Sequence, residues 1–188
     1  MKLKRDFFLR PTLEVAKDLL GKHLVYESPE GRVVGEINEV ESYIGQDDPA
    51  CHASASPKTN GKTERTKTMF LEGGHAYIYF TYGMYYCLNV VTEKADYPSA
   101  ILIRSIIPVE GEKIMMNNRA KSTTEYLANG PGKLCQAYGL ERHQNGIDLV
   151  TSDVLYLEDS GKKIKKFQTT ARIGITKGQD KLWRFHYE

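Results

Sequence analysis

Three side chains that could take part in catalysis share one face of a predicted strand. Glu39, Glu41 and Tyr43 occupy alternating positions within residues 32–43, and alternate residues of a strand point to the same side. One interpretation is a solvated face without a role, because exposed glutamates are common. The other is a carboxylate general base beside an aromatic stacking surface. The spacing leaves both interpretations open.

A second group of aromatic side chains lies in residues 75–91, which contain five tyrosines. The β-branched and aromatic content predicts two strands joined by a turn at Tyr82-Gly83-Met84. Packing within the sheet is the expected role of Tyr77, Tyr85 and Tyr86. Tyr82 differs, because an aromatic at a hairpin tip has little of its own chain to pack against and is suited to entering a base stack. Tyrosines can also stack on an extruded base.

Other reactive residues are ambiguous by themselves. His52 could be structural or exposed, and Arg104 could cap a sheet edge. Cys51 and His52 lie just after Asp47 and Asp48, but adjacent residues rarely point at one ion and no second cluster completes a ligand set, so no metal is expected. The chain has no GxSxG motif, no P-loop and no GxGxxG after a strand. Acyl transfer, nucleotide hydrolysis and dinucleotide redox chemistry therefore lack support.

The composition indicates a single cytoplasmic domain over residues 1–188. The net charge is +2, which permits nucleic-acid binding without indicating it. No apolar stretch approaches the roughly 20 residues of a membrane helix, and the charged N-terminal segment is unlike a signal peptide. The three cysteines form no CxxC pair, so neither a disulfide framework nor a thiolate zinc site is expected.

Two basic clusters stand out locally. One is formed by Lys58, Lys62, Arg65 and Lys67, and the other by Lys162, Lys163, Lys165 and Lys166. A solvated loop or hairpin explains either cluster, and lysine-rich turns commonly protect sheet edges.

Periodicity and breakers predict an α+β fold in which a curved, mainly antiparallel sheet carries the candidate residues. The predicted helices cover residues 11–20, 110–120 and 131–140. The predicted strands cover residues 23–26, 32–43, the two halves of 75–91, 99–107, 154–158, 171–176 and 182–187. Residues 45–67 are polar and predict a long surface loop, and long loops in compact domains are often functional.

Several motifs, in this order, resemble the alkyladenine (3-methyladenine) DNA glycosylase family. They are VESYIG from Val40, AYIYFTYGMYYCLN from Ala76, ILIR from Ile101, GPGKLCQA from Gly130 and ARIGI from Ala171. The resemblance covers nearly the whole chain, and the compact start is typical of a bacterial-type member. It implies a curved sheet with flanking helices and a protruding β-hairpin, similar to the C-terminal domain of methionyl-tRNA formyltransferase.

The resemblance also implies roles for residues that match the family motifs. Glu41 matches the carboxylate that activates the attacking water, and Arg104 matches the arginine that helps to hold this water and a nearby phosphate. The flipped base would be sandwiched by Tyr43, His52 and Tyr79. Asn89 matches a residue of the pocket floor that discriminates against the exocyclic amine of guanine.

Further residues match those that contact the duplex in this family. Tyr82 resembles the wedge that fills the space vacated by the flipped nucleotide. Two residues match those that flank the wedge against neighbouring base pairs, Met69 and Leu102. Phosphate contacts are expected from Arg65, Lys133 and Arg172.

The implied function is excision of damaged purines from double-stranded DNA by a monofunctional glycosylase. Such an enzyme must flip the base out of the helix, because a stacked base is out of reach. We expect no lyase activity, because no lysine matches a Schiff-base nucleophile, and no metal, cofactor or membrane association; the protein is expected to act as a monomer. Two rival functions are a non-catalytic module that binds damaged bases and an RNA-contacting accessory domain. Glu41 argues against the first, and the wedge Tyr82 against the second.

Overall fold

A computed structural model describes residues 1–55, 60–121, 123 and 126–188. The helices are α1 (Arg5–Phe8), α2 (Thr12–Leu19), α3 (Glu112–Asn118) and α4 (Pro131–Tyr138), with short 3-10 helices η1 (Lys67–Phe70) and η2 (Arg142–Gln144). The strands are β1 (His23–Ser28), β2 (Gly31–Ile44), β3 (Ala76–Thr81), β4 (Tyr85–Val91), β5 (Ser99–Glu110), β6 (Leu155–Glu158), β7 (Gln168–Thr170) and β8 (Arg184–His186). Lys58 of the first basic cluster lies outside the described residues.

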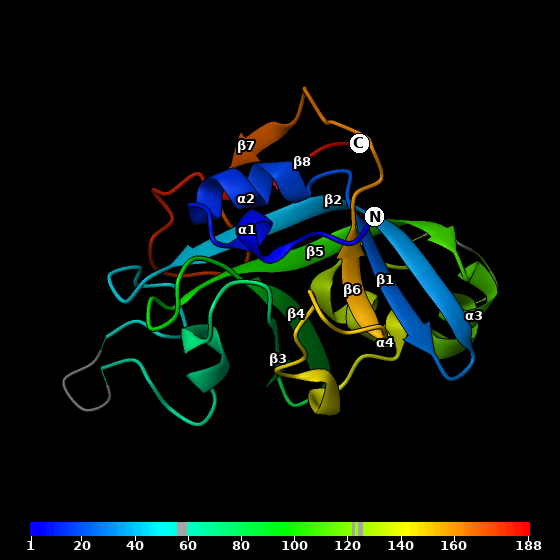
Figure 1. Cartoon of the computed structure of the whole chain (residues 1–188), viewed down its shortest axis with the longest axis horizontal. Helices are drawn as coiled ribbons and strands as arrows, with labels where there is room; N and C mark the ends of the chain where they lie inside the picture. The colour runs from blue at the N-terminus through cyan, green and yellow to red at the C-terminus, as the bar shows by residue number, and fades with distance from the viewer. Residues whose placement is uncertain (56–59, 122, 124–125) are drawn as a thin grey trace.

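The strands form one antiparallel sheet in the order β3-β4-β5-β2-β1-β6, and β8 joins β2 to β7. The long strands β2 and β5 pair over most of their length and run side by side through the centre of the molecule (Figure 1). This arrangement confirms the predicted α+β class with a curved antiparallel sheet. Among the described residues, no helix has the length and apolar character needed to cross a membrane.

Two helices cover the sheet and form the main core with it. Helix α2 starts after Pro11, whose fixed φ suits a helix entry, and it packs Val15 and Leu19 against β2 and β5. Helix α4 ends at Gly139, which has a left-handed φ of 68°. Its last residue, Tyr138, is fully buried and donates a hydrogen bond to the carbonyl of Leu24 in β1. Tyr138 therefore connects α4 to the sheet.

The predicted hairpin is present as β3 and β4. Its strands pair from Ala76 opposite Val90 to Thr81 opposite Tyr85. Tyr82 and Gly83 both have positive φ values, 51° and 64°, as the tight turns that match strand twist require. The backbone therefore places Tyr82 at the tip, as predicted.

The boundary between β5 and α3 differs from the prediction. The strand continues past residue 107 to Glu110 and includes Pro108. A register shift between Val34 and Gly35 places Pro108 opposite a bulge, where proline is tolerated in a sheet. The helix begins only at Glu112, after Gly111 turns the chain with a φ of 78°.

The predicted strand over residues 171–176 is wrong. The strand in this region is β7, which ends at Thr170, and the following residues form a loop. Gly174 has a φ of 74°, and Arg172 and Ile173 bond to distant side chains instead of a strand partner. The strand predicted over 182–187 is confirmed in a shorter form as β8. The lysine-rich residues 162–166 lie in the exposed loop between β6 and β7.

Candidate active site

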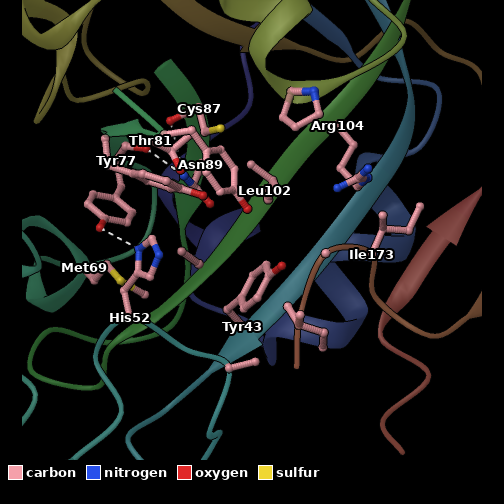
Figure 2. A pocket seen from close by; sticks show the side chains of 17 residues that line it. Tyr43, His52, Met69, Tyr77, Thr81, Cys87, Asn89, Leu102, Arg104 and Ile173 are labelled. Carbon is pink, nitrogen blue, oxygen red and sulfur yellow. Dashed lines mark hydrogen bonds between the residues drawn. The ribbon is translucent and has the colours of Figure 1, made fainter. Parts of the chain in front are cut away.

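A cavity of about 310 Å³ opens where β2, the hairpin, β5 and the loop after β7 meet. This volume is at the lower end of the range of about 300–1,000 Å³ for small-molecule sites. All the predicted catalytic, base-stacking and intercalating residues except Glu41 line it. Figure 2 shows His52 and Met69 at one end of the hollow and Arg104 and Ile173 at the other. Aromatic rings form much of the wall between these ends, so the cavity is suited to a flat ligand.

Glu41 lies directly behind the cavity wall and is fully buried. Its Oε2 accepts a hydrogen bond of 2.8 Å from the Tyr43 hydroxyl, and its Oε1 accepts one of 2.7 Å from the Ile173 backbone N–H. The Arg104 guanidinium lies 3.4 Å from the same Oε1. A carboxylate removed from water needs such partners. The interpretation of Glu41 as part of a solvated face is therefore wrong.

Arg104 is shared between two carboxylates of β2. Its Nε donates to Glu39 Oε1 at 2.9 Å, and Arg184 of β8 donates to the same oxygen at 2.5 Å. Burial by itself would lower the pKa of Arg104, but Glu41 and Glu39 together raise it. These contacts confirm that Glu39, Glu41 and Tyr43 share one face, and they fix the guanidinium at the end of the cavity.

His52 and Tyr79 form an aromatic corner on the opposite side. The two ring centroids are 4.5 Å apart with a T-shaped orientation, and His52 Nδ1 is 3.1 Å from the Tyr77 hydroxyl. His52 lines the cavity and is exposed. Desolvation against these rings and the nearby Arg65 lower its pKa to about 4. His52 is therefore neutral near pH 7.

The buried end of the hairpin supplies the cavity floor. Asn89 is 3% exposed, and its Nδ2 donates to the Tyr77 carbonyl at 3.0 Å. This bond fixes the orientation of the amide. Tyr77 packs as expected, at 1% exposure, but it also lines the cavity.

Some cavity residues have no role in the sequence-based prediction. They are Ala50, Thr81, Cys87, Ala100, Pro131 and Ile173 to Ile175. Cys87 could have been found from strand pairing, because it lies directly opposite Tyr79. The position of Ile173 in the cavity could not have been found from the sequence, because its pattern predicts a strand where the structure has a loop.

The residues expected to intercalate divide into two groups. Tyr82 is 83% exposed at the hairpin tip, which fits a residue that contacts another molecule. Met69 and Leu102 are 1% and 4% exposed and lie in the cavity wall. Packing of η1 and β5 places both below the surface, and their place beside the wedge stays a prediction.

The three residues expected to bind phosphates also differ from one another. Arg65 is exposed, with its guanidinium 5.3 Å from the Tyr79 ring centroid and 3.5 Å from His52 Nε2. Lys133 is half-buried, and its Nζ donates to Asn129 at the start of α4. Arg172 is buried in an ion pair with Asp48. The prediction of a phosphate contact for Arg172 is therefore corrected, because its side chain is withdrawn from the surface.

The described residues contain no group of three or more His, Cys, Asp or Glu side chains arranged to hold a metal ion. Asp48, which lies near Cys51 in the sequence, is instead bound to Arg172. Burial opposes its ionisation, but the Arg172 hydrogen bonds and backbone N–H groups hold the pKa of Asp48 below its usual value.

Comparisons with known proteins identify the family of the chain. A family model described as methylpurine-DNA glycosylase matches residues 6–188. A protein of Methanocella arvoryzae named "Putative 3-methyladenine DNA glycosylase" is 52% identical over 98% of this chain and 91% of its own length. Proteins with the same name from Rickettsia felis and Clostridium novyi are 44% and 42% identical, over 97% and 98% of this chain and 91% and 94% of their own lengths. The chain therefore belongs to the methylpurine-DNA glycosylase family of DNA-repair hydrolases.

Proposed function

We propose that this protein flips an alkylated or deaminated purine out of duplex DNA and hydrolyses its N-glycosidic bond with a water activated by Glu41. The observation that carries the proposal is the placement of Glu41. A buried carboxylate that forms an ion pair with Arg104 lies behind one end of an aromatic cavity, and its hydrogen-bond donors, Tyr43 and Ile173, form part of the cavity wall. A pure binding module has no need of this carboxylate.

Extrusion of the base would be assisted by the hairpin tip. An enzyme acting on a base cannot reach it inside a duplex, and extrusion costs a few kcal/mol, least for a lesion that pairs badly. Tyr82 is the exposed aromatic at the tip and also borders the cavity. It can therefore fill the gap in the base stack while the base enters the cavity beside it.

The flipped purine would lie between Tyr43 on one side and the His52–Tyr79 corner on the other. A neutral His52 stacks on a base without adding charge to the cavity. Asn89 lies at the floor with its amide held by the Tyr77 carbonyl, where it can oppose the exocyclic amine of guanine. The proposed substrates are 3-methyladenine, hypoxanthine and etheno-adenine.

The chemistry would take place at the end of the cavity formed by Arg104 and Ile173, next to Glu41. Cleavage of the C1′–N9 bond leaves its electron pair on the base and develops positive charge on the sugar, as in ordinary glycoside hydrolysis. The Glu41 carboxylate can stabilise this charge and accept the proton of the water that attacks C1′. Arg104, held by Glu39, can position the water. An alkylated base such as 3-methyladenine leaves readily because it already carries positive charge, whereas hypoxanthine needs hydrogen bonds or protonation.

The products would be a free base and an abasic site, the starting point of base excision repair. We propose that the enzyme acts on double-stranded DNA as a cytoplasmic monomer, without a cofactor and without lyase activity. Arg65 and Lys133 remain the proposed phosphate contacts.

The decisive test is base release from a labelled duplex with one hypoxanthine and from methylated DNA, with undamaged duplex of the same sequence as control. Alkali then converts abasic sites into strand breaks. We expect breaks only after alkali and only in damaged DNA. Breaks without alkali would indicate lyase activity. If folded protein bound the lesion but released no base from either substrate, the protein would be a damage-binding module.

A further inference from the structure

The most deeply buried ion pair among the described residues lies directly behind the active site. Arg172 Nη1 contacts Asp48 Oδ2 at 2.6 Å, and Nη2 contacts Oδ1 at 2.9 Å. Neither side chain has any exposed surface. A buried pair gains little stability over apolar packing because both charges must be desolvated. Its two-pronged geometry does, however, fix direction as well as distance.

The pair connects three separate parts of the cavity wall. Asp48 accepts the backbone N–H groups of Ile44 at 3.3 Å and Ala50 at 3.2 Å, so it shapes the loop that leads from β2 to His52. Arg172 donates to the carbonyl of Ser42 at 2.9 Å, between Glu41 and Tyr43 in the sequence. The same guanidinium donates to Gly178 at the far end of the loop after β7.

Arg172 also contacts the groups that act on the base and water, without reaching the cavity itself. Its guanidinium carbon lies 4.8 Å from the centroid of the Tyr43 ring and 5.1 Å from that of Trp183. Residue 173 follows it directly, and its backbone N–H is the donor to Glu41 Oε1. A movement of Arg172 would therefore shift both the Tyr43 ring and a hydrogen bond to the carboxylate.

We infer that the Arg172–Asp48 pair is a positioning device for the glycosylase reaction. The pair holds the Tyr43 ring in place on the side of the cavity opposite His52, and it directs the Ile173 N–H to Glu41. Neither Arg172 nor Asp48 would touch the base or the water. The inference rests on the proposed function. It assigns to Arg172 a positioning role in place of a phosphate contact. A purely structural pair would stabilise the fold without a specific effect on the rate.

The test compares two variants of the pair with a matched control. Asp48→Asn removes the charge but keeps the shape, and Arg172→Lys keeps the charge but loses the planar fork. The control is Asp148→Asn, which weakens another Arg–Asp contact, 2.6 Å from Arg5, and neither of these two residues lines the cavity. Base release is measured with saturating enzyme on methylated duplex, beside affinity for undamaged duplex and the thermal midpoint, at a temperature where every variant is folded.

Both variants of the pair should lower the single-turnover rate by about 10- to 100-fold, the range expected from a misplacement of about 1 Å. Affinity for undamaged duplex should stay within about twofold, because neither residue is exposed to DNA. The control should lose stability but keep its rate. Trp183 is the only tryptophan of the chain, and its quenching by acrylamide should increase in Asp48→Asn as Arg172 is released.

The possible failures are distinguishable. A wild-type rate in Asp48→Asn, or a loss of rate in the control that matches its loss of stability, would overturn the inference and leave the proposed function intact. A wild-type rate in Arg172→Lys would show that charge alone suffices and would overturn the positioning role. No base release by the wild-type protein would refute the proposed function and the inference with it.

Discussion

Replacing Glu41 with glutamine separates the chemistry of the site from its architecture. Glutamine has the same shape, and its amide oxygen can accept from the Ile173 N–H as Oε1 does. Its amide nitrogen would face the Tyr43 hydroxyl, which can rotate to accept instead of donate. Every hydrogen bond of the site can therefore persist while the negative charge is lost.

The expected loss of stability is smaller than the expected increase in the reaction barrier. Hydrogen bonds to a charged group contribute about 1.5–3 kcal/mol each and neutral ones about 0.5–1.5 kcal/mol. Two such bonds would lose about 2–3 kcal/mol, and relief of the desolvation of a buried carboxylate offsets part of this. The loss of a general base costs about 10²- to 10⁴-fold in rate, equivalent to about 3–5 kcal/mol in the barrier. Arg104 remains paired with Glu39, so no cation is left without a partner.

The assay is single-turnover base release from a hypoxanthine duplex with enzyme in excess, together with the affinity of the variant for the same duplex. We expect the rate to fall by at least about 100-fold with the affinity nearly unchanged. A rate within about tenfold of wild type would refute the role of Glu41 as the base. A parallel collapse of affinity and thermal midpoint would show that the carboxylate is structural.

Three further outcomes follow from individual side chains. Tyr82→Ala should weaken lesion capture in a binding assay but leave the thermal midpoint nearly unchanged, because 83% of the side chain is exposed; unchanged capture would remove the wedge role. The pKa of His52 is about 4 in the folded protein and 6.5 in the unfolded chain, so the unfolded state binds more protons between these values. The free energy of unfolding should therefore fall as the pH is lowered from 6.5 towards 4, and urea titrations of His52→Gln should lack this part of the pH dependence. Arg65→Ala should reduce the slope of log affinity against log salt by about 1 if Arg65 binds a phosphate, and an unchanged slope would argue against that contact.

Much of the active site follows from local patterns in the chain. Strand alternation predicts that Glu41 and Tyr43 share a face, and the 2.8 Å hydrogen bond between them confirms it. Glycine at position 83 predicts a tight hairpin turn with Tyr82 at its tip. The positive φ values of Tyr82 and Gly83 confirm this turn. Such features depend on residues close in sequence, whose geometry is set by backbone periodicity.

The order of the motifs over nearly the whole chain also predicted the family, which the family model and the relatives confirm. The order of the motifs did not reveal which parts of the fold the loop after β7 contacts. Its apolar and β-branched residues favour a strand, but Arg172 and Ile173 find partners in β2 and the following loop.

Those partners lie more than 120 positions earlier in the chain, at residues 41, 42 and 48. Local periodicity carries no information about contacts at such separation, because they depend on how the sheet curves and which strands meet. The same limitation applies to Met69 and Leu102. The sequence does not say whether their side chains are exposed, because their burial depends on the packing of η1 against β3 and β5. The sequence by itself determined the family, the α+β class, most of the strands and the hairpin with Tyr82 at its tip. Only the tertiary structure decided that Glu41 is buried, that Arg172 is paired with Asp48 in the interior, and that the loop after β7 lines the cavity.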